Sequence, residues 1–422
     1  MKVGGTVRVP GDKSITHRLL LLAAMARGTS HIGGALTSLD ARATARCLRQ
    51  LGAGVSPLRS GTVTRVDGLG RLRAPDRRLD CGNAGTTARL LLGLLAAHRF
   101  ETRLTGDASL RRRPMRRVTE PLGVMGARFA PAGAETLPLS IWGGRLTGLR
   151  WDLPVSSAQV KGALLFAGMA GQVPVSLREP SGLSRDHSER LLRAFGYPVE
   201  TVAGRIEFGP GGRLVPFDIQ VPGDPSSAAF IIGAALLAES GELSIPGVGL
   251  NPTRTGFMAV LERMGGGVRI TDAEERHGEP VGTIHAGAAG LTGTEVLAAE
   301  IPGLVDEVPL LAVLASRAAG TTVFREVGEL RVKESDRLGL IAANLRALGA
   351  KAEVQGNDLC VSGSDAPPRG KVRTEGDHRL AMAFAVLGTL PGARVAIDDP
   401  DCAAVSFPGF AETLRAIRRG RA

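Results

Sequence analysis

One local pattern recurs six times along the chain. An amphipathic segment begins with Leu, places another apolar residue three positions later and, in five of the six cases, ends in Gly. Apolar residues at this spacing mark one face of a helix, and Gly suits the left-handed conformation that follows many helices. The segments are 48–52, 122–126, 192–196, 261–265, 345–349 and, without its Gly, 414–417. We therefore predict six surface-facing helices in repeats of about 70 residues.

A second series of segments alternates with the first. Each contains the small, capping and turn residues that a helix start requires, and an apolar stretch such as 19–25 or 230–237 follows it. These predicted starts are 10–14, 81–86, 154–159, 222–227, 302–307 and 375–379. We expect each repeat to contain one buried helix, one surface-facing helix and strands between them.

Short strand-like segments separate the predicted helices. The candidate strands are Thr6–Val9, Thr102–Leu104, Val173–Leu177, Ile219–Val221, Leu243–Ile245, Thr322–Phe324 and Arg394–Ile397. A chain of 422 residues is too long for one ordinary core, so two domains are expected. The six repeats divide into two groups of three, with a join near Pro222–Pro225. The pattern predicts an α/β protein of two domains.

The predicted starts of the buried helices carry cations. Lys13 and Arg18 belong to the first start, Arg89 lies one turn after Asn83, and Arg379 belongs to the last. Phosphates and carboxylates bind at helix N-termini, because these present unpaired N–H groups and partial positive charge. More cations cluster at 111–113 and 331–337. Any one of these segments could be a structural turn or solvated surface, but their recurrence at matching points favours an anion site in an interdomain cleft.

The composition limits the other classes of function. The net charge of +11 favours anionic partners, but two Trp and one Tyr are too few for the stacking surface of a nucleic-acid-binding protein. The four cysteines form no CxxC pair and have no His at metal-ligand spacing, so we expect reduced thiols and no metal site. Residues 1–9 lack the apolar stretch of a signal peptide, and the apolar runs are too short to span a bilayer. We expect a cytoplasmic protein that contacts neither nucleic acid nor membrane.

A series of short motifs extends in order over essentially all 422 residues. The motifs are Lys13-Ser14 with Arg18, 83–86, 113–115, 157–159, 185–187, 306–307, 331–337, 377–379 and 406–408. In this combination they resemble those of the EPSP synthase family, the 3-phosphoshikimate 1-carboxyvinyltransferases.

The resemblance implies a fold and a domain layout. The fold is a two-domain inside-out α/β barrel (the EPT fold) with six βαβαββ repeats, three per domain, and the active site in the interdomain cleft. Residues 1–11 and 224–422 would form one domain and residues 12–223 the other, so the chain would cross between domains twice.

The resemblance also implies an activity. The enolpyruvyl group of phosphoenolpyruvate would pass to the 5-hydroxyl of shikimate 3-phosphate, with release of phosphate and formation of 5-enolpyruvylshikimate 3-phosphate, a step of chorismate and aromatic amino acid biosynthesis. The reaction would need no metal or organic cofactor, and the enzyme is expected to be a monomer.

The matching motifs assign expected roles to individual residues. Shikimate 3-phosphate would be bound by Lys13, Ser14, Arg18, Ser157, Gln159, Arg185, Asp306 and Lys333. Phosphoenolpyruvate would be bound by Lys13, Asn83, Gly85, Arg113, Gln159, Arg337 and Arg379. Arginine suits both substrates, because its planar fork pairs bidentately with carboxylate and phosphate.

The chemistry requires at least one acid and one base that can reverse their roles. We assign Asp306 as the base toward the hydroxyl and Glu334 as the donor to the methylene carbon, while Lys13 shares either proton or stabilises the departing phosphate. Structural alternatives are a helix N-cap for Asp306 and an ion pair with Arg337 for Glu334. Both alternatives are compatible with catalysis.

The chain departs from many family members at two positions. Ala158 stands where a hydroxyl residue is common, and Val405 stands where a lysine is common. Gly85 leaves room beside the expected phosphoenolpyruvate site, as in members sensitive to glyphosate, so we expect glyphosate to inhibit in the micromolar range.

Three alternative functions fit parts of the sequence. UDP-N-acetylglucosamine 1-carboxyvinyltransferases share the fold and the donor, but they pair the first lysine with Asn, where this chain has Ser14, and usually carry a Cys in the loop that is 106–114 here. Only the net charge of +11 suggests a nucleic-acid-binding protein. A purely structural repeat protein would not explain why cations and paired carboxylates gather at helix starts.

Overall fold

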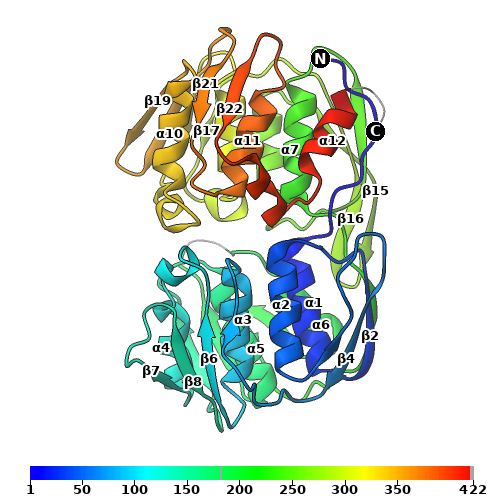
Figure 1. Cartoon of the computed structure of the whole chain (residues 1–422), viewed down its shortest axis with the longest axis vertical. Helices are drawn as coiled ribbons and strands as arrows, with labels where there is room; N and C mark the ends of the chain where they lie inside the picture. Colours follow the sequence, from blue (N-terminus) through cyan, green and yellow to red (C-terminus); the bar gives the residue numbers. More distant parts are fainter. Residues whose placement is uncertain (181–182, 419–422) are drawn as a thin grey trace. The chain divides into compact units, whose positions relative to one another are not determined.

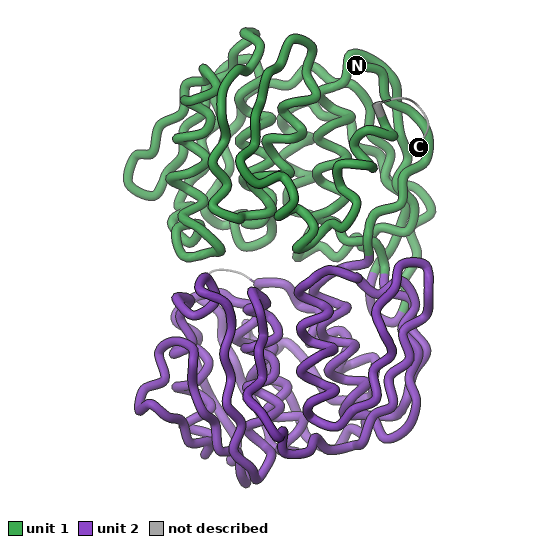
Figure 2. Tube along the Cα trace, in the orientation of Figure 1, with its two compact units in different colours: residues 1–10, 222–276, 280–422 green, residues 11–221, 277–279 purple. Residues whose placement is uncertain are grey.

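The computed structural model describes residues 1–180 and 183–418. The chain divides into two compact units (Figure 2): unit 1 contains Met1–Pro10, Pro222–Arg276 and Pro280–Ala422, and unit 2 contains Gly11–Val221 and His277–Glu279. Each unit has its own hydrophobic core. The chain thus leaves unit 1 after Pro10 and returns to it at Pro222.

The described residues of unit 2 form six α-helices that alternate between two environments. Helices α1, α3 and α5 are apolar and buried along most of their length, whereas α2, α4 and α6 bury one face. Their bounds are α1 Lys13–Met25, α2 Leu39–Gln50, α3 Gly85–Leu95, α4 Arg116–Val124, α5 Ala158–Gly171 and α6 His187–Ala194. The alternation of buried and surface-facing helices predicted from the sequence is confirmed.

Three four-stranded sheets accompany these helices in unit 2. Each begins with a parallel pair and continues with two antiparallel pairings, in the orders β13-β2-β4-β3, β5-β6-β8-β7 and β9-β10-β12-β11. The strands are β2 Arg27–Gly33, β3 Gly54–Val55, β4 Thr64–Leu69, β5 Leu79–Asp80, β6 Glu101–Thr105, β7 Arg128–Ala130, β8 Leu139–Trp142, β9 Leu149–Asp152, β10 Val175–Arg178, β11 Val199–Val202, β12 Arg205–Phe208 and β13 Asp218–Gln220.

Unit 1 repeats this plan except in its third sheet, which has two strands among the described residues. Its helices are α7 Pro225–Leu236, α8 Gly256–Arg263, α9 Val308–Ala315, α10 Arg337–Ala347, α11 His378–Leu387 and α12 Phe410–Arg418. Its sheets are β1-β14-β16-β15, β17-β18-β20-β19 and the pair β21-β22. The strands are β1 Gly5–Thr6, β14 Glu242–Gly249, β15 Val268–Arg276, β16 Glu279–Gly287, β17 Glu295–Val296, β18 Thr321–Phe324, β19 Lys351–Gln355, β20 Asp358–Ser362, β21 Arg369–Val372 and β22 Arg394–Ile397.

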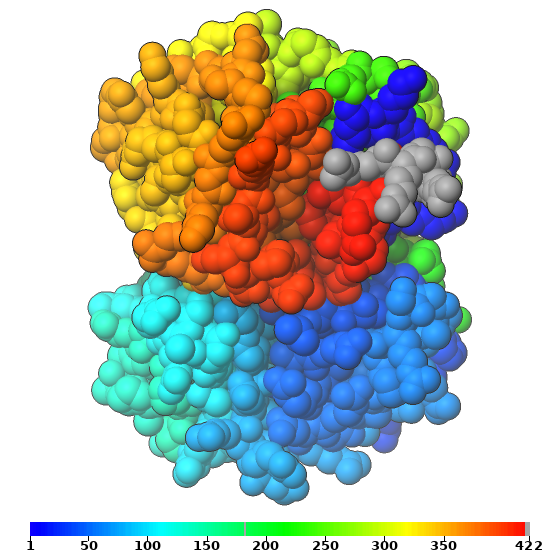
Figure 3. Space-filling view, turned by 45° about the horizontal axis from the view of Figure 1, so that its top comes forward, coloured from blue at the N-terminus to red at the C-terminus, as the bar shows by residue number. Residues whose placement is uncertain are grey.

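The helices occupy the middle of each unit and the sheets lie outside them (Figure 1), which is the predicted inside-out α/β barrel of βαβαββ repeats. Two strands pair in a different unit from the helix that follows them in the chain. Strand β1 precedes α1 of unit 2 but pairs with β14 of unit 1, and β13 precedes α7 of unit 1 but pairs with β2 of unit 2. Within the described residues the sixth repeat ends at α12, which lies at the surface of unit 1 (Figure 3, red).

The glycines predicted to end the surface-facing helices adopt the expected conformation. Gly52, Gly126, Gly196, Gly265 and Gly349 have φ angles of +94°, +115°, +78°, +84° and +90°. L-residues pay a steric penalty there that Gly avoids. The predicted strand Thr6–Val9 is shorter than expected, because β1 covers only Gly5–Thr6. Among the described residues, the helices are all too short or too polar to cross a membrane.

Candidate active site

The predicted site residues divide between the two units. Unit 2 contains Lys13, Ser14, Arg18, Asn83, Gly85, Arg113, Ser157, Gln159 and Arg185, and unit 1 contains Asp306, Lys333, Glu334, Arg337 and Arg379. We call these sets the unit 2 cluster and the unit 1 cluster, and describe each by itself.

The unit 2 cluster begins at the N-terminus of α1. Asp12 caps this helix by accepting a hydrogen bond from the backbone N–H of Ile15 at 2.8 Å. Lys13 follows, and its Nζ lies 3.4 Å from Oδ2 of Asp40 in α2. The ammonium is therefore held at a helix start, where the backbone N–H groups add further positive potential.

Arg18 lies one turn further along α1 and is only 2% exposed. Its guanidinium donates to Ser188 Oγ at 2.8 Å and to the carbonyl oxygens of Ser14 and Ala158 at 3.0 and 3.1 Å. All three acceptors are neutral. Burial lowers the pKa of Arg18 to about 10, which leaves the group charged at neutral pH. The arrangement supplies a buried positive charge that a phosphate could neutralise.

The neighbouring imidazole adds no charge to this region. Burial, reinforced by the positive charges of Lys13 and Arg18, lowers the pKa of His17 to about 3. Its Nδ1 lies 2.6 Å from Thr44 Oγ1. His17 is therefore neutral at physiological pH and acts as a polar packing group.

The start of α3 has a pair of guanidinium groups beside it, those of Arg89 and Arg113. Arg113 Nη2 donates to Asn83 Oδ1 at 2.6 Å, and Asn83 Nδ2 donates to Asp107 Oδ2 at 2.7 Å. A Cβ atom on Gly85 would lie 2.8 Å from Arg89 Nη1 and 3.3 Å from Arg113 Nη1. The missing side chain therefore lets both cations approach the N-terminus of α3.

Arg89 was not among the predicted binding residues, yet it joins α3 to the predicted residue Gln159. Its Nη1 donates to Gln159 Oε1 at 2.5 Å and its Nη2 donates to the carbonyl of Pro114 at 2.9 Å. Gln159 Nε2 in turn donates to Thr86 Oγ1 at 3.0 Å. The position of Arg89, four residues after Gly85 on the same helix, is the signal that could have identified it.

Ser157 and Arg185 complete the unit 2 cluster. Ser157 is the N-cap of α5, and its Oγ accepts from the backbone N–H of Val160 at 3.5 Å. Arg185 lies two residues before α6, and its positive charge is close enough to lower the pKa of Arg18. Lys13, Arg18 and Arg185 thus concentrate positive charge around the starts of three helices.

The unit 1 cluster is centred on Asp306. Its Oδ1 lies 3.2 Å from Arg337 Nη1 and its Oδ2 lies 3.1 Å from Arg379 Nη2. Arg337 also pairs with Glu334 and with Asp377. Burial alone would lower the pKa of Arg337, but the carboxylates of Asp377, Glu334 and Asp306 outweigh burial and raise it.

Exposure separates the carboxylates of this cluster into two kinds. The side chains of Asp306 and Glu334 are 15% and 23% exposed, whereas those of Asp377 and Glu307 are 0% and 2% exposed. The first two can reach a ligand, and the other two act within the protein.

Two alternatives raised from the sequence can be compared with the geometry. The N-cap position of α9 is occupied by Glu307, so Asp306 does not serve as the N-cap of that helix. The ion pair between Glu334 and Arg337 is present. Lys333 lies 3.5 Å from Glu329, and burial lowers the pKa of its ammonium.

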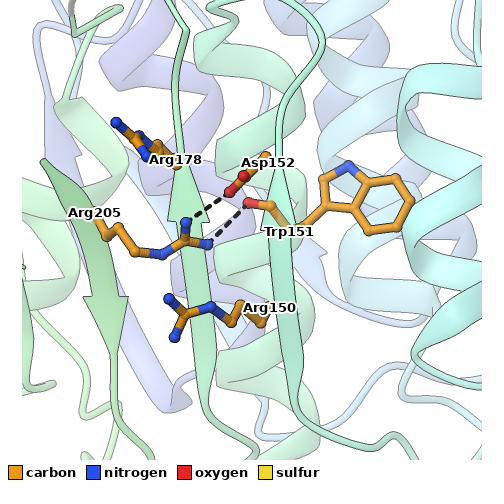
Figure 4. Close-up of a pocket in the computed structure, with 5 residues that line it drawn as sticks. All are labelled: Arg150, Trp151, Asp152, Arg178 and Arg205. Atoms are coloured by element: carbon orange, nitrogen blue, oxygen red, sulfur yellow. Dashed lines mark hydrogen bonds and ion pairs between the residues drawn. The ribbon is translucent and has the colours of Figure 1, made fainter.

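Other features lie outside the two clusters. A hollow of about 480 Å³ on the outer face of β9, β10 and β12 is lined by Arg150, Trp151, Asp152, Arg178 and Arg205 (Figure 4), none of them a predicted site residue. In the described parts of the chain, no group of three or more His, Cys, Asp or Glu residues could hold a metal ion.

Comparison with known proteins identifies relatives over the whole chain. Residues 1–414 match the family model described as EPSP synthase (3-phosphoshikimate 1-carboxyvinyltransferase). A protein of that enzyme name from Desulforamulus reducens is 43% identical over 419 residues, covering 99% of this chain and 97% of the relative. One from Synechococcus sp. is 46% identical over 424 residues, covering 98% and 97%.

Solved structures agree with this relationship. The EPSP synthase of Acinetobacter baumannii is similar with a TM-score of 0.87 at 38% identity, covering 99% of this chain and 96% of the other. The enolpyruvyl transferase NikO of Streptomyces tendae superposes with a TM-score of 0.76 over 99% of this chain and 95% of the other. At 20% identity the second comparison shows the fold alone.

Proposed function

The chain belongs to the EPSP synthase (3-phosphoshikimate 1-carboxyvinyltransferase) family, and we propose that it transfers the enolpyruvyl group of phosphoenolpyruvate to the 5-hydroxyl of shikimate 3-phosphate. The products are 5-enolpyruvylshikimate 3-phosphate and inorganic phosphate. The observation that carries the proposal is the position of Asp306, a partly exposed carboxylate held between Arg337 and Arg379. This pairs an acid–base group with the cations that a substrate phosphate or carboxylate requires.

Shikimate 3-phosphate is assigned mainly to the unit 2 cluster. Lys13, Ser14, Arg18, Ser157, Gln159 and Arg185 would bind it there, together with Asp306 and Lys333 of unit 1. The buried guanidinium of Arg18 supports this assignment, because its hydrogen-bond acceptors are neutral groups and a phosphate could pair with its charge.

Phosphoenolpyruvate is assigned to Lys13, Asn83, Gly85, Arg113 and Gln159 of unit 2 and to Arg337 and Arg379 of unit 1. Asn83 supports this role by bonding Arg113 at 2.6 Å, which orients the guanidinium near the start of α3. To this set we add Arg89, which bonds Gln159 at 2.5 Å.

The reaction moves two protons. Asp306 accepts the proton of the 5-hydroxyl while that oxygen bonds to C2 of phosphoenolpyruvate, and Glu334 gives a proton to the methylene carbon C3. The tetrahedral intermediate then loses phosphate, which leaves with the proton that Asp306 accepted, while C3 returns its proton to Glu334. This restores the C2–C3 double bond, now as the enol ether of the product. Lys13 balances the charge of the departing phosphate. Each acid or base step of this type contributes typically about 10²–10⁴-fold in rate.

The scheme draws on residues of both units. Holding the two polyanions against each other makes their reaction effectively unimolecular, which can be worth about 7–11 kcal/mol of the barrier. That the site lies in a cleft between the domains, that the enzyme is a monomer and that it is cytoplasmic remain predictions.

The decisive experiment is phosphate release from phosphoenolpyruvate with and without shikimate 3-phosphate. We expect release only when both are present, and a fall of about 10²-fold or more in kcat for Lys13→Ala, Asp306→Ala and Glu334→Ala. Asp358→Asn is the matched control, since Asp358 also pairs with an arginine of unit 1, at 2.8 Å, but lies outside the cluster. Release that depends on UDP-N-acetylglucosamine instead would refute the proposal.

A further inference from the structure

A buried lysine and glutamate lie behind the unit 2 cluster. Lys161 projects from α5 and Glu179 follows β10, and the Nζ of the first lies 2.9 Å from Oε2 of the second. Their side chains are 0% and 1% exposed. Neither residue belongs to the predicted binding or catalytic sets.

All three N–H donors of the Lys161 ammonium have an acceptor. Besides Glu179, the ammonium donates to the carbonyl of Ser184 at 2.8 Å and lies 2.8 Å from Oε1 of Glu189. An ammonium group has three donors in total, so its hydrogen-bonding capacity is satisfied inside the protein. Lys161 is therefore fixed in one orientation and is not available to a substrate.

Every polar atom of Ser184 is bound to this pair. Its backbone N–H donates to Glu179 Oε2 at 3.0 Å, its hydroxyl donates to Glu179 Oε1 at 2.5 Å, and its carbonyl accepts from Lys161. Ser184 directly precedes Arg185 in the chain. Both backbone polar groups of Ser184, directly before Arg185, are thus held by the ion pair: the N–H by Glu179 and the carbonyl by Lys161.

The same carboxylate holds a second site residue. Glu179 Oε1 accepts from the backbone N–H of Ser157 at 3.0 Å, directly before the first turn of α5. One side chain therefore fixes the backbone at Ser157 and next to Arg185, which are 28 positions apart in sequence.

We propose that Lys161 and Glu179 are positioning residues that hold Ser157 and Arg185 in the geometry that binds shikimate 3-phosphate. The inference rests on the proposed function, because that function assigns the two residues to this substrate. The pair reaches the ligand only through the backbone, so its removal should weaken binding of shikimate 3-phosphate and leave binding of phosphoenolpyruvate largely intact.

A purely stabilising role is the competing explanation. Buried ion pairs are weak contributors to stability, since desolvation offsets most of the attraction. Two carboxylates, those of Glu179 and Glu189, also share this one lysine. A pair that served only stability would not require the directed hydrogen bonds to Ser157 and Ser184, so these bonds favour a positioning role.

The test is Glu179→Gln, with KM for each substrate and kcat measured separately. The amide keeps the size of the side chain and leaves Lys161 paired with Glu189, so the fold should persist. An amide has one acceptor oxygen where the carboxylate has two, so at least one of the hydrogen bonds from Ser157 and Ser184 is lost. We expect KM for shikimate 3-phosphate to rise by about tenfold or more, and KM for phosphoenolpyruvate to change less than twofold, on the scale of misplaced binding groups.

Two companion variants keep the test decisive. Ser184→Ala removes only the hydroxyl that donates to Glu179 Oε1, keeps the two backbone contacts of Ser184 and alters no buried charge, so it should raise KM for shikimate 3-phosphate by a smaller factor than Glu179→Gln. Glu207→Gln, on β12 of the same unit, removes a carboxylate that bonds Ser176 at 2.8 Å outside the cluster, and should change neither KM. If Glu179→Gln leaves both KM values unchanged, whether or not it loses thermal stability, the inference is wrong. A larger rise in KM for shikimate 3-phosphate in Ser184→Ala than in Glu179→Gln would also contradict it. The proposed function fails separately, if the wild-type enzyme shows no phosphate release dependent on shikimate 3-phosphate.

Discussion

The Nε atom of Arg337 lies 2.7 Å from Oδ2 of Asp377, and the two side chains are 1% and 0% exposed. The same carboxylate caps α11 by accepting from the backbone N–H of Arg379 at 2.9 Å. Asp377 thus orients the guanidinium of one arginine assigned to phosphoenolpyruvate and the backbone of the other. It does so from the interior, without reaching the ligand itself.

Replacing Asp377 separates these two effects. Asp377→Asn keeps an acceptor for the helix cap but leaves the buried guanidinium of Arg337 with only Asp306 and Glu334 as charged partners. We expect unfolding free energy to fall by about 3 kcal/mol, the lower end for breaking a buried pair. Asp377→Ala also loses the cap and should cost about 1 kcal/mol more. Urea denaturation measures both, and equal midpoints for the wild type and the Asn variant would contradict the charge argument.

Gly85→Ala tests the contact between the start of α3 and the two guanidinium groups. The new Cβ would meet Arg89 Nη1 at 2.8 Å and Arg113 Nη1 at 3.3 Å, and both are the far ends of flexible side chains. Stability should therefore change little, while the displaced cations bind phosphoenolpyruvate less well. We expect KM for phosphoenolpyruvate to rise on the order of tenfold, with that for shikimate 3-phosphate unchanged.

The Gly85→Ala variant can also be used to test inhibition by glyphosate. For the wild type we expect inhibition in the micromolar range that phosphoenolpyruvate relieves, and for Gly85→Ala a weaker inhibition. Turnover of the wild type that is unaffected by saturating glyphosate at scarce phosphoenolpyruvate would show that the expectation is wrong.

The helices could be predicted from the sequence because their signals are local. A Leu and a second apolar residue three positions later define a buried face, and the following Gly takes a positive φ wherever the pattern has one, as at Gly349. The capping residues likewise lie within a few positions of the backbone they bond, as Asp12 does with Ile15. The inside-out arrangement of the repeats came from the family resemblance rather than from periodicity.

The partners of the polar side chains could not be predicted in this way. Arg18 donates to Ser188, which is 170 positions away, and Arg337 pairs with Asp377, which is 40 positions away. These pairings depend on how helices of different repeats pack. Lys161 and Glu179 carry no local motif for the same reason, although a lysine inside an apolar helix requires an acidic partner on general grounds.

The buried imidazole of His17 predicts a loss of stability in acid. Its pKa is about 3 in the folded protein, below the usual 6.5, so between these values the unfolded chain binds a proton that the folded chain does not. The contribution of neutral His17 to the free energy of unfolding is complete above pH 6.5. It is lost as the pH falls toward 3, and the loss is at most about 5 kcal/mol. His17→Gln should flatten the dependence of the melting temperature on pH over this window.

Two exposed glycines of unit 2 should respond to alanine in opposite directions. Gly123 lies within α4 and Gly196 follows α6, and a Cβ on either would meet no heavy atom within 4 Å. Contacts therefore cannot explain a difference between Gly123→Ala and Gly196→Ala. Gly123 is helical, so alanine should stabilise unit 2 by about 0.5–1 kcal/mol through reduced entropy of the unfolded chain. Gly196 has a φ of +78°, where a Cβ costs roughly 1–2 kcal/mol. Shifts of the urea midpoint with the same sign for both variants would show that backbone conformation does not determine the role of the glycine that ends each repeat helix.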